Sequence, residues 1–211
     1  QITAGTTPSS HRTWHLPTAL LSQHSTHLRN AATDPSHPSY PGLSSLTLPT
    51  THPSTFQTFI DYMYSNIYSQ HKRSASYHPI HSHASAWILG FALDTPVYKT
   101  VALRCLYNEV VPLALDSSSG VLQSPIRPSD IEFVCKETAS GCVLRALLFD
   151  AVAAHWKQSE VLNLTYDMEI DTPWLAIYNT YPDFRTRLSN SLKVGDAFRY
   201  DMLRPVDDYV A

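Results

Sequence analysis

Apolar side chains recur every three or four residues between positions 54 and 68, STFQTFIDYMYSNIY. The repeating positions are Phe56, Phe59, Ile60, Met63, Tyr64 and Ile67. This spacing is that of one face of an amphipathic α-helix, so these side chains are predicted to face a core. Ser54 followed by Gln57 predicts a capping box at the helix start, with Pro53 just before the cap.

The same spacing predicts helices along most of the chain and short strands near its beginning. Predicted helices lie at residues 18–22, 25–32, 54–68, 83–93, 96–111, 129–138, 142–156 and 182–192. Predicted strands lie at 2–5, 12–16 and 45–49. Ser129 and Glu132 predict a second capping box, and the helix at 142–156 is so apolar that we expect the first part of the chain to bury it. Inward-facing side chains are predicted at Ala84, Trp87, Ile88, Phe91, Ala92, Val97, Val101, Cys105 and Leu106.

These elements predict an α+β fold in which a small β-sheet flanks a cluster of helices. Loops are expected at 33–42, which is rich in proline and serine, and at 70–82, which is polar and rich in histidine. The segment DSSSG at 116–120 is the best internal boundary. We therefore expect a first domain at 1–115 and a helical extension at 116–211 that packs on it.

Composition and charge narrow the classes of partner. Of the 211 residues, 43% are hydrophobic and 16% are charged, which is typical of a globular protein. The longest uncharged apolar run, 84–93, is too short to cross a bilayer. The net charge is −3 and Lys72-Arg73 is the one adjacent basic pair, so the chain has no basic footprint for nucleic acid. Neither a membrane nor a nucleic acid is expected as a partner.

Cysteine usage indicates the compartment. Cys105, Cys135 and Cys142 form no CxxC pair, so we expect reduced thiols in an intracellular protein, in the nucleus or the cytoplasm. The chain opens with QITAG, without Met and without a basic or apolar leader, and a trimmed N-terminus is expected.

Two groups of residues could support chemistry. His78, His81 and His83, in HPIHSH, could ligate a metal ion, but no cysteine or carboxylate lies near them in sequence, which favours solvated loop histidines. Cys142 follows Gly141 at a predicted helix start, where the helix dipole favours a thiolate nucleophile, but a small core residue is the favoured interpretation. No cofactor and no small-molecule substrate are expected. A hydrolase or a metal-binding protein built on these residues is the alternative function.

The order of several segments carries a family resemblance. Residues 14–21, WHLPTALL, followed by Ser25 and Leu28, lead from a strand into a Leu-Leu helix. Residues 59–66, FIDYMYSN, end the central helix on an aromatic pattern. Two further segments follow in order, at 84–115 and 131–148. Together they resemble the BTB/POZ domain, with a helical extension common in its fungal members, over most of residues 2–156.

The resemblance implies a non-enzymatic protein-interaction module. Such an adaptor self-associates, for example as a homodimer, or docks a protein partner such as a cullin-type ubiquitin-ligase scaffold. Pro17 and Thr18 stand where the family pattern has His-Lys, so the role of that pair is not expected here. A structural subunit of a larger assembly is a further alternative.

The partner surface is predicted at the end of the central helix. Asp61, Tyr62, Asn66 and Tyr68 lie off its apolar face by helical geometry and are expected to be at least partly exposed. Tyrosine presents a large contact area at low entropy cost, so Tyr62 and Tyr68 are candidate anchors. The alternative is that these tyrosines belong to the core and rim of the helical cluster.

Overall fold

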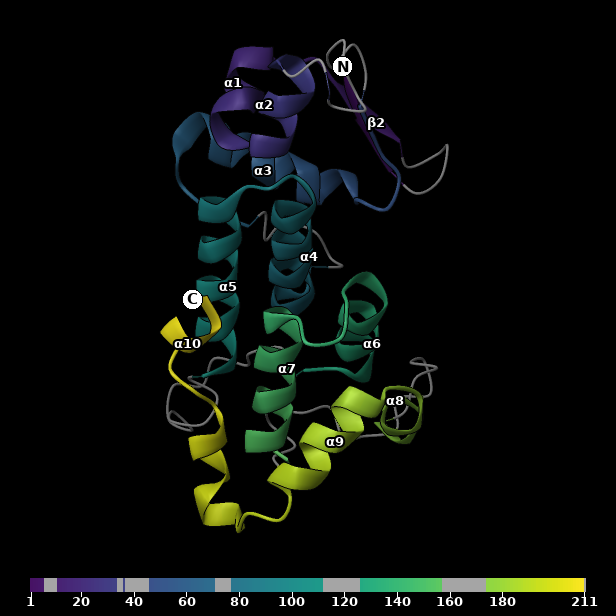
Figure 1. Ribbon diagram of the computed structural model, residues 1–211, viewed down its shortest axis with the longest axis vertical. Coiled ribbons are helices and arrows are strands. Elements are labelled where there is room, and N and C mark those ends of the chain that lie inside the picture. The colour runs from purple at the N-terminus through teal and green to yellow at the C-terminus, as the bar shows by residue number, and fades with distance from the viewer. Residues whose placement is uncertain are drawn as a thin grey trace. The chain divides into compact units, whose positions relative to one another are not determined.

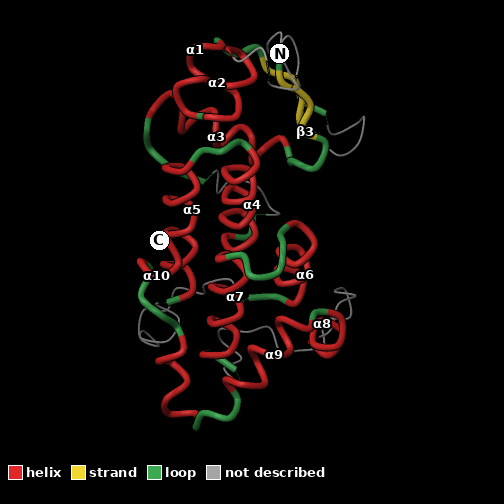
Figure 2. Tube along the Cα trace, in the orientation of Figure 1, coloured by secondary structure: helices red, strands yellow, loops and turns green. Residues whose placement is uncertain are grey.

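The computed structural model is mostly helical with one small β-sheet, so the fold class is α+β (Figures 1 and 2). It describes residues 1–5, 11–33, 36, 46–70, 77–111, 126–156 and 174–210. The loop predicted at 33–42 lies almost entirely outside the described residues, and so does part of the one at 70–82. The boundary predicted at 116–120 lies wholly outside them.

Every segment predicted as a strand or helix contains such an element. The strands are β1 (Ile2–Ala4), β2 (Arg12–Trp14) and β3 (Leu46–Leu48). The helices are α1 (Thr18–His24), α2 (Thr26–Thr33), α3 (Pro53–Ser65), α4 (Pro79–Ala92), α5 (Pro96–Val110), α6 (Pro128–Glu137), α7 (Val143–Ala154), α8 (Trp174–Thr180), α9 (Pro182–Ser191) and α10 (Asp207–Val210), with a 3-10 helix, η3 (Asp196–Met202). The sequence did not predict α8, η3 or α10. Within the described part of the chain, no helix is long and apolar enough to cross a membrane.

β1 is the central strand of the sheet. β2 pairs with it antiparallel, with Thr3 opposite Thr13, and β3 pairs with it parallel, with Thr3 opposite Thr47. Ile2 and Ala4 are buried while Thr3 between them is half-buried. This alternation is that of a strand with one face toward a core.

The chain divides into two compact units. Unit 1 consists of residues 1–77 and 85–102, and unit 2 consists of residues 78–84 and 103–211. Unit 1 carries the sheet, α1 to α3, most of α4 and the first part of α5. Unit 2 carries the remainder of α4 and α5 and all the later elements. The predicted domain division at 116–120 stays a prediction.

α3 forms the centre of the core of unit 1. Phe56 and Phe59 are completely buried, and the Trp14 ring meets Phe56 edge-on with 5.0 Å between ring centroids. Phe59 meets Tyr98 of α5 at 4.9 Å, and the Trp14 indole donates a hydrogen bond of 3.0 Å to Gln57. Aromatic pairs of this geometry contribute about 0.5–1.5 kcal/mol beyond their burial. These contacts fix α3 to β2 and to α5.

The last part of the predicted apolar face is not buried. Tyr64 is 64% exposed and Ile67 is 68% exposed, so the prediction that these two side chains face the core is wrong. α3 ends at Ser65, and Asn66 takes the left-handed conformation with φ 54°, which turns the chain away before Ile67. The helical spacing therefore predicts the core up to Met63.

Proline displaces both predicted capping boxes. α3 and α6 each begin at a proline, the residue whose fixed φ and missing N–H suit the first helical position. At α3 the cap is His52, whose ring Nδ1 accepts the N–H of Ser54 at 3.2 Å. At α6 the carboxylate of Asp130 accepts the N–H of Arg127 at 2.8 Å, so Ser129 is not the cap.

Gly90 lets α4 approach α5 closely. A Cβ at Gly90 would lie 3.1 Å from Cβ of Lys99, and the Lys99 ammonium lies 5.8 Å from the ring centroids of Trp87 and Phe91. Three side chains predicted to face inward here are exposed: Phe91 at 65%, Val97 at 66%, and Ala92. Those inward positions are therefore wrong.

α7 is the core helix of unit 2. Its completely buried side chains include Leu144, Leu147, Leu148, Ala151 and Val152. Its principal neighbours are α6, α9, η3 and α10. The predicted burial of this helix is confirmed, and its principal neighbours come from the later part of the chain. The expected packing of the extension on the first domain stays a prediction.

A buried carboxylate joins α7 to the C-terminal elements. Asp150 is completely buried and accepts hydrogen bonds from two nitrogens of Arg187 and, at 2.6 Å, from the hydroxyl of Tyr209. The Nε of Arg204 lies 3.7 Å from the same carboxylate. Burial, followed by the bond to Asp150, raises the pKa of Tyr209. Removing one partner of such a buried charge leaves the charge uncompensated, which typically costs about 3–5 kcal/mol.

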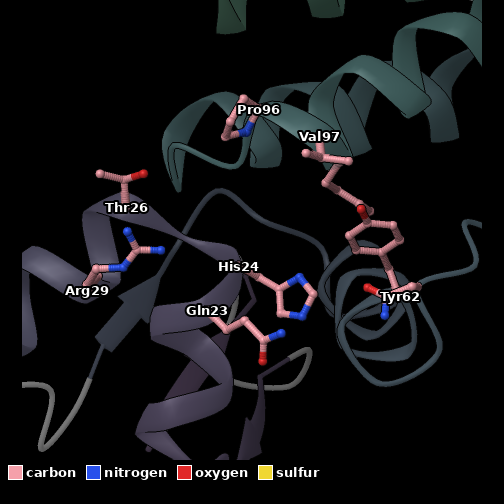
Figure 3. Close-up of a pocket in the computed structure, with 9 residues that line it drawn as sticks. Gln23, His24, Thr26, Arg29, Tyr62, Pro96 and Val97 are labelled. Atoms are coloured by element: carbon pink, nitrogen blue, oxygen red, sulfur yellow. The ribbon is translucent and has the colours of Figure 1, made fainter.

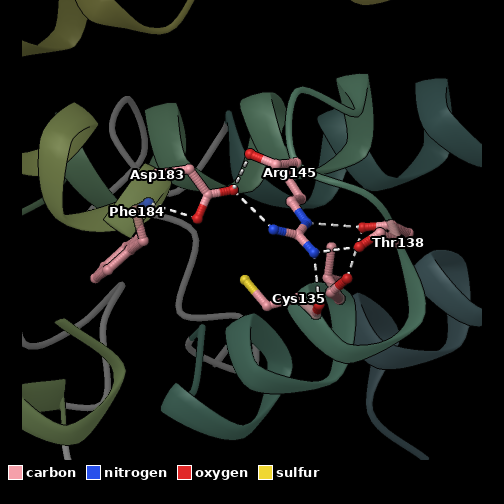
Figure 4. Close-up of polar contacts among 7 residues, drawn as sticks. Cys135, Thr138, Arg145, Asp183 and Phe184 are labelled. Carbon is pink, nitrogen blue, oxygen red and sulfur yellow. Dashed lines mark hydrogen bonds and ion pairs between the residues drawn. The ribbon is translucent and has the colours of Figure 1, made fainter. Parts of the chain in front are cut away.

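Arg145 ties the end of α6 to the start of α9 (Figure 4). It donates to the hydroxyl and carbonyl of Thr138, to the Cys135 carbonyl at 2.5 Å and to the Asp183 carboxylate at 2.7 Å. Burial raises the pKa of Asp183, but hydrogen bonds from Arg145 and from the N–H of Phe184 hold it below its ordinary value. Burial raises the pKa of the Cys135 thiol to about 12, so this thiol stays protonated at neutral pH.

Candidate docking site at the end of α3

The four predicted partner-binding residues lie in the second half of α3 and just beyond it. Asn66 is exposed, Asp61 and Tyr68 are half-buried, and Tyr62 is 6% exposed. The expected partial exposure is confirmed for Asp61, Asn66 and Tyr68 and is wrong for Tyr62. Partner binding by the four residues stays a prediction.

Tyr62 is buried because α3 is covered on more than its apolar face. The Tyr62 ring lies 5.0 Å from the ring of Tyr98 in α5 and 5.9 Å from the ring of His24 in α1. Burial also raises the pKa of Tyr62. Helical spacing within α3 cannot reveal these neighbours, because they come from other parts of the chain.

Tyr62 and Asn66 line a cavity of about 320 Å³ within unit 1, which we call the α3 cavity (Figure 3). Its other lining residues come from the end of α1, from α2 and from the start of α5: Gln23, His24, Thr26, Arg29, Pro96, Val97 and Tyr98. In Figure 3, His24 and Tyr62 lie next to each other, below Pro96 and Val97 of α5. The volume is at the lower end of the range of about 300–1,000 Å³ found for ligand pockets.

Asn66 shapes the rim of the α3 cavity. Its N–H donates to the Tyr62 carbonyl at 2.7 Å while its left-handed conformation ends α3. Asparagine adopts this conformation more readily than most residues with a side chain. The Ser65 hydroxyl donates to the Asp61 carbonyl at 2.7 Å and accepts the N–H of Ile67 at 3.0 Å. The backbone at this end of the cavity is therefore held in place.

Ser25 fixes the opposite wall. Its completely buried hydroxyl donates to the Leu93 carbonyl and accepts the N–H of Leu28 at 3.0 Å. The N–H of Thr26 donates to the Asp94 carbonyl at 3.2 Å. A hydroxyl cap of this kind typically contributes about 1 kcal/mol. These bonds hold the junction of α1 and α2 against the turn between α4 and α5.

The polar side chains of the lining have unused hydrogen-bonding capacity. Within the described residues, four of them make no hydrogen bond: Gln23, His24, Thr26 and Asn66. Arg29 donates through Nε to the Ser22 carbonyl at 2.8 Å, and its two terminal nitrogens contact no acceptor in the described part of the chain. Groups of this kind are satisfied by water or by a bound molecule. Several such groups therefore line one cavity, which makes the α3 cavity a candidate binding site.

Tyr98 supplies a buried aromatic surface at the α3 cavity. It is 1% exposed, and its hydroxyl has no hydrogen-bond partner among the described residues. Burial raises the pKa of Tyr98, and the nearby Tyr62 and Asp61 raise it further. A buried polar group without a partner costs about 1–3 kcal/mol, so a bound group that reached this hydroxyl would recover that free energy.

Sequence reasoning found Tyr62 and Asn66 but missed Gln23, His24, Arg29 and Tyr98. These residues lie far from α3 in the chain, and helical periodicity carries no information about which helix ends meet. One signal was present: the segment 23–29, QHSTHLR, is polar although it lies between two apolar patterns. Polar residues at a junction of two short helices are favoured where the junction borders solvent or a ligand.

The three histidines of HPIHSH do not lie in a solvated loop. α4 begins just after His78, and both His78 and His83 are buried, so the expected loop position is wrong. The Nδ1 atoms of His78 and His81 lie 3.4 Å and 4.0 Å from the Asp130 carboxylate, and Nε2 of His83 lies 3.8 Å from that of Glu109. Among the described residues, no three or more His, Cys, Asp or Glu side chains are arranged to hold a metal ion.

Cys142 is not the core residue that its sequence context favours. It caps α7, is half-buried and lines a second cavity of about 680 Å³ together with Arg145, Asp183 and Arg187. No histidine is among the described residues that line this cavity. All three cysteines are free thiols. Among the described residues, therefore, no imidazole lines the cavity beside Cys142.

No family model, curated protein or solved structure matches this chain. The resemblance of residues 2–156 to the BTB/POZ domain therefore stays a prediction from the sequence. The α3 cavity is the feature of the structure that best supports a functional proposal, because it joins buried aromatic rings to polar side chains that have no hydrogen-bond partner among the described residues.

Proposed function

We propose that this chain is a protein-interaction module of BTB/POZ type, an adaptor that binds a protein partner or a second copy of itself at the α3 cavity. The observation that carries the proposal is the meeting of the buried pair Tyr62 and Tyr98 with hydrogen-bonding side chains that have no partner in the described residues. The family resemblance makes a cullin-type ubiquitin-ligase scaffold one candidate partner.

The order of elements supports the family assignment. Two strands lead into α1 and α2, a third strand completes the sheet, and α3, α4 and α5 follow. This is the order that the sequence segments 14–28, 59–66 and 84–115 predict by their resemblance. α6 and α7 then occupy the segment that resembles the fungal extension.

The anatomy of the α3 cavity suits a docking site for protein. Interfaces commonly combine buried aromatic anchors with a polar rim, and tyrosine and arginine are enriched at their energetic centres. The cavity has Tyr62 and Tyr98 inside, and Arg29 and Asn66 at exposed positions. Its walls are fixed by the hydrogen bonds of Ser25 and by the end of α3, so little ordering is needed when a partner binds.

The alternative functions have less support. The hydrolase alternative requires a base near Cys142, and the described lining of its cavity contains no histidine. The metal alternative requires ligands that converge on one point. Among the described residues, His78 and His81 face Asp130, His83 faces Glu109, and no group of three or more His, Cys, Asp or Glu is arranged to hold a metal ion. A structural subunit of a larger assembly remains compatible with the α3 cavity, because such a subunit also docks protein.

Site-specific photo-crosslinking tests the proposal. A photoreactive phenylalanine analogue is introduced at Asn66 on the rim of the α3 cavity or, as the matched control, at Tyr64. Tyr64 belongs to the same helix and is exposed but does not line the cavity. Illumination of the full chain in extract, and of the purified chain alone, reports hetero-association and self-association respectively.

The expected result is a discrete crosslinked protein, or a crosslinked homodimer, from position 66 and much less of the same product from position 64. The crosslinked protein is then purified and its affinity for the unmodified chain is measured. Equal products from both positions, or a purified protein that does not bind, would contradict docking at the α3 cavity.

A further inference from the structure

We infer that the occupant of the α3 cavity is an acidic segment of a partner protein, and that a carboxylate side chain of this segment pairs with Arg29. The inference rests on the proposed function, because it names the chemistry of the partner that the same site binds. It is carried by the charges of the lining and by the unused donors of the Arg29 guanidinium.

The lining of the α3 cavity has basic residues and no acidic ones. Arg29 is its permanent cation, His24 is its other basic residue, and no aspartate or glutamate is among the described lining residues. Two carboxylates lie nearby in the fold. Asp61 accepts a hydrogen bond of 2.9 Å from Gln57, and Asp94 lies on the turn whose carbonyl receives the Thr26 N–H. Neither carboxylate is among the described residues that line the cavity, so Arg29 is the permanent charge of this lining.

Arg29 is held in a position that suits a carboxylate. Its Nε donates to the Ser22 carbonyl at the end of α1, which orients the planar guanidinium. The two terminal nitrogens have no acceptor among the described residues. A guanidinium with two terminal nitrogens available matches the two oxygens of a carboxylate, and such charge-assisted pairs are stronger than neutral hydrogen bonds.

Neutral donors complete the set around Arg29. The side-chain amides of Gln23 and Asn66 line the same cavity and have no hydrogen bond in the described structure. The N-terminal ends of α2 and α5 and the C-terminal ends of α1 and α3 border the cavity. The partial charges of these helix ends have opposite signs, so their effects on a bound ion oppose one another. The side chains, therefore, decide which charge is preferred.

The balance of charge over unit 1 agrees with an acidic partner. Unit 1 contains five Lys or Arg residues and three Asp or Glu residues. Unit 2 contains ten Lys or Arg residues and fifteen Asp or Glu residues. Complementary charge steers association and disfavours partners of like charge. An acidic segment is therefore attracted to the unit that holds the α3 cavity.

Peptide selection on the full chain tests the inference while the partner itself is unidentified. Random twelve-residue peptides displayed on phage are selected on wild type, Arg29→Gln, Arg29→Glu and the control Arg185→Gln. Arg185 is an exposed arginine of unit 2 and does not line the α3 cavity. We expect wild type and Arg185→Gln to enrich peptides with Asp or Glu at one fixed position. Arg29→Gln should lose this preference, and Arg29→Glu should replace it with Lys or Arg.

A thermodynamic cycle then isolates the pair. The enriched peptide and its variant with Gln or Asn at the fixed position are titrated into wild type and Arg29→Gln. Either single change should weaken binding roughly tenfold, as expected for a charge-assisted hydrogen bond, and the second change should add little. Added salt should weaken the wild-type pair and leave the neutral combination nearly unchanged.

Two outcomes would overturn the inference in different ways. If selected peptides bind through the cavity, so that Tyr62→Phe weakens them, but show no acidic preference, the acidic partner is wrong and the proposed function stands. If no selected peptide is sensitive to Tyr62→Phe, Asn66→Ala or Arg29→Gln, both the acidic partner and docking at the α3 cavity are wrong.

Discussion

Tyr62 shows how the surroundings of a single residue decide its role. Helical geometry places it off the apolar face of α3, which predicts exposure, yet its ring is enclosed by His24 and Tyr98 from two other helices. The alternatives of interface tyrosine and core tyrosine are therefore not exclusive, since Tyr62 is buried and also lines the α3 cavity.

Two substitutions of Tyr62 should distinguish the contribution of its ring to stability from that of its hydroxyl. Tyr62→Ala removes a buried ring and should destabilise the fold by about 3–5 kcal/mol, as other buried aromatic truncations do. Tyr62→Phe keeps the ring and should leave the stability nearly unchanged, because the hydroxyl makes no hydrogen bond within the described residues. Urea denaturation of both variants checks this. Equal stability for Tyr62→Ala and wild type would show that the ring is not part of the core.

Asp183 should make the stability of unit 2 sensitive to acid. Its pKa is lowered in the folded protein, despite the opposing effect of burial, by hydrogen bonds from Arg145 and Phe184. Its stabilising contribution is therefore present above the unfolded value of about 3.9 and is lost as the pH falls through the lower folded value. Asp183→Asn should cost roughly 1.5–3 kcal/mol at pH 7, and the difference from wild type should shrink below pH 4.

Urea midpoints measured at pH 7, 5 and 3 check this expectation. Glu137→Gln is the control, since Glu137 is an exposed acid at the end of α6. If the difference in urea midpoint between wild type and Asp183→Asn stayed constant from pH 7 to pH 3, the ion pair of Asp183 with Arg145 would be excluded as the source of that difference.

At the scale of elements, periodicity predicts where helices and strands lie better than it predicts their ends and faces. The strongly patterned segments all contain the expected element, whereas α3, α4 and α6 start at prolines upstream of the predicted starts. The face of α5 is also displaced: Tyr98 is buried where Val97 was predicted to be. A start position and a contact face depend on which neighbour covers the helix, and a local pattern does not contain that information.

Gly90 offers a test of the packing between α4 and α5. Alanine is the better helix former by about 1 kcal/mol, but its Cβ would lie 3.1–3.2 Å from Lys99 atoms that include the backbone. Gly90→Ala should therefore destabilise the fold by roughly 1–3 kcal/mol through overpacking. Gly195→Ala is the matched control, because its Cβ meets nothing closer than 3.9 Å. A stabilised Gly90→Ala variant would show that the two helices can separate at little cost.

At the scale of the whole molecule, sequence reasoning gives the fold class and two of the nine described residues that line the α3 cavity, Tyr62 and Asn66. The α+β class, the small sheet and the buried helix α7 follow from patterns in the chain. The α3 cavity does not, because Gln23, Arg29 and Tyr98 reach it through the packing of α1, α2 and α5 around α3. Unit 1 thus gathers the lining of the α3 cavity from distant segments, while unit 2 builds its own core around α7.

Docking at the α3 cavity is tested most directly by the dissociation constant of the protein crosslinked from Asn66, or of the homodimer. It is measured by calorimetry for wild type, Asn66→Ala, Tyr62→Phe and the control Tyr64→Phe, which makes the same change at an exposed position of the same helix. Asn66→Ala and Tyr62→Phe should each weaken binding by about 1–2 kcal/mol, or roughly five- to thirtyfold, with unchanged melting temperatures. Tyr64→Phe should bind like wild type. The same affinity for all four proteins would contradict docking at the α3 cavity.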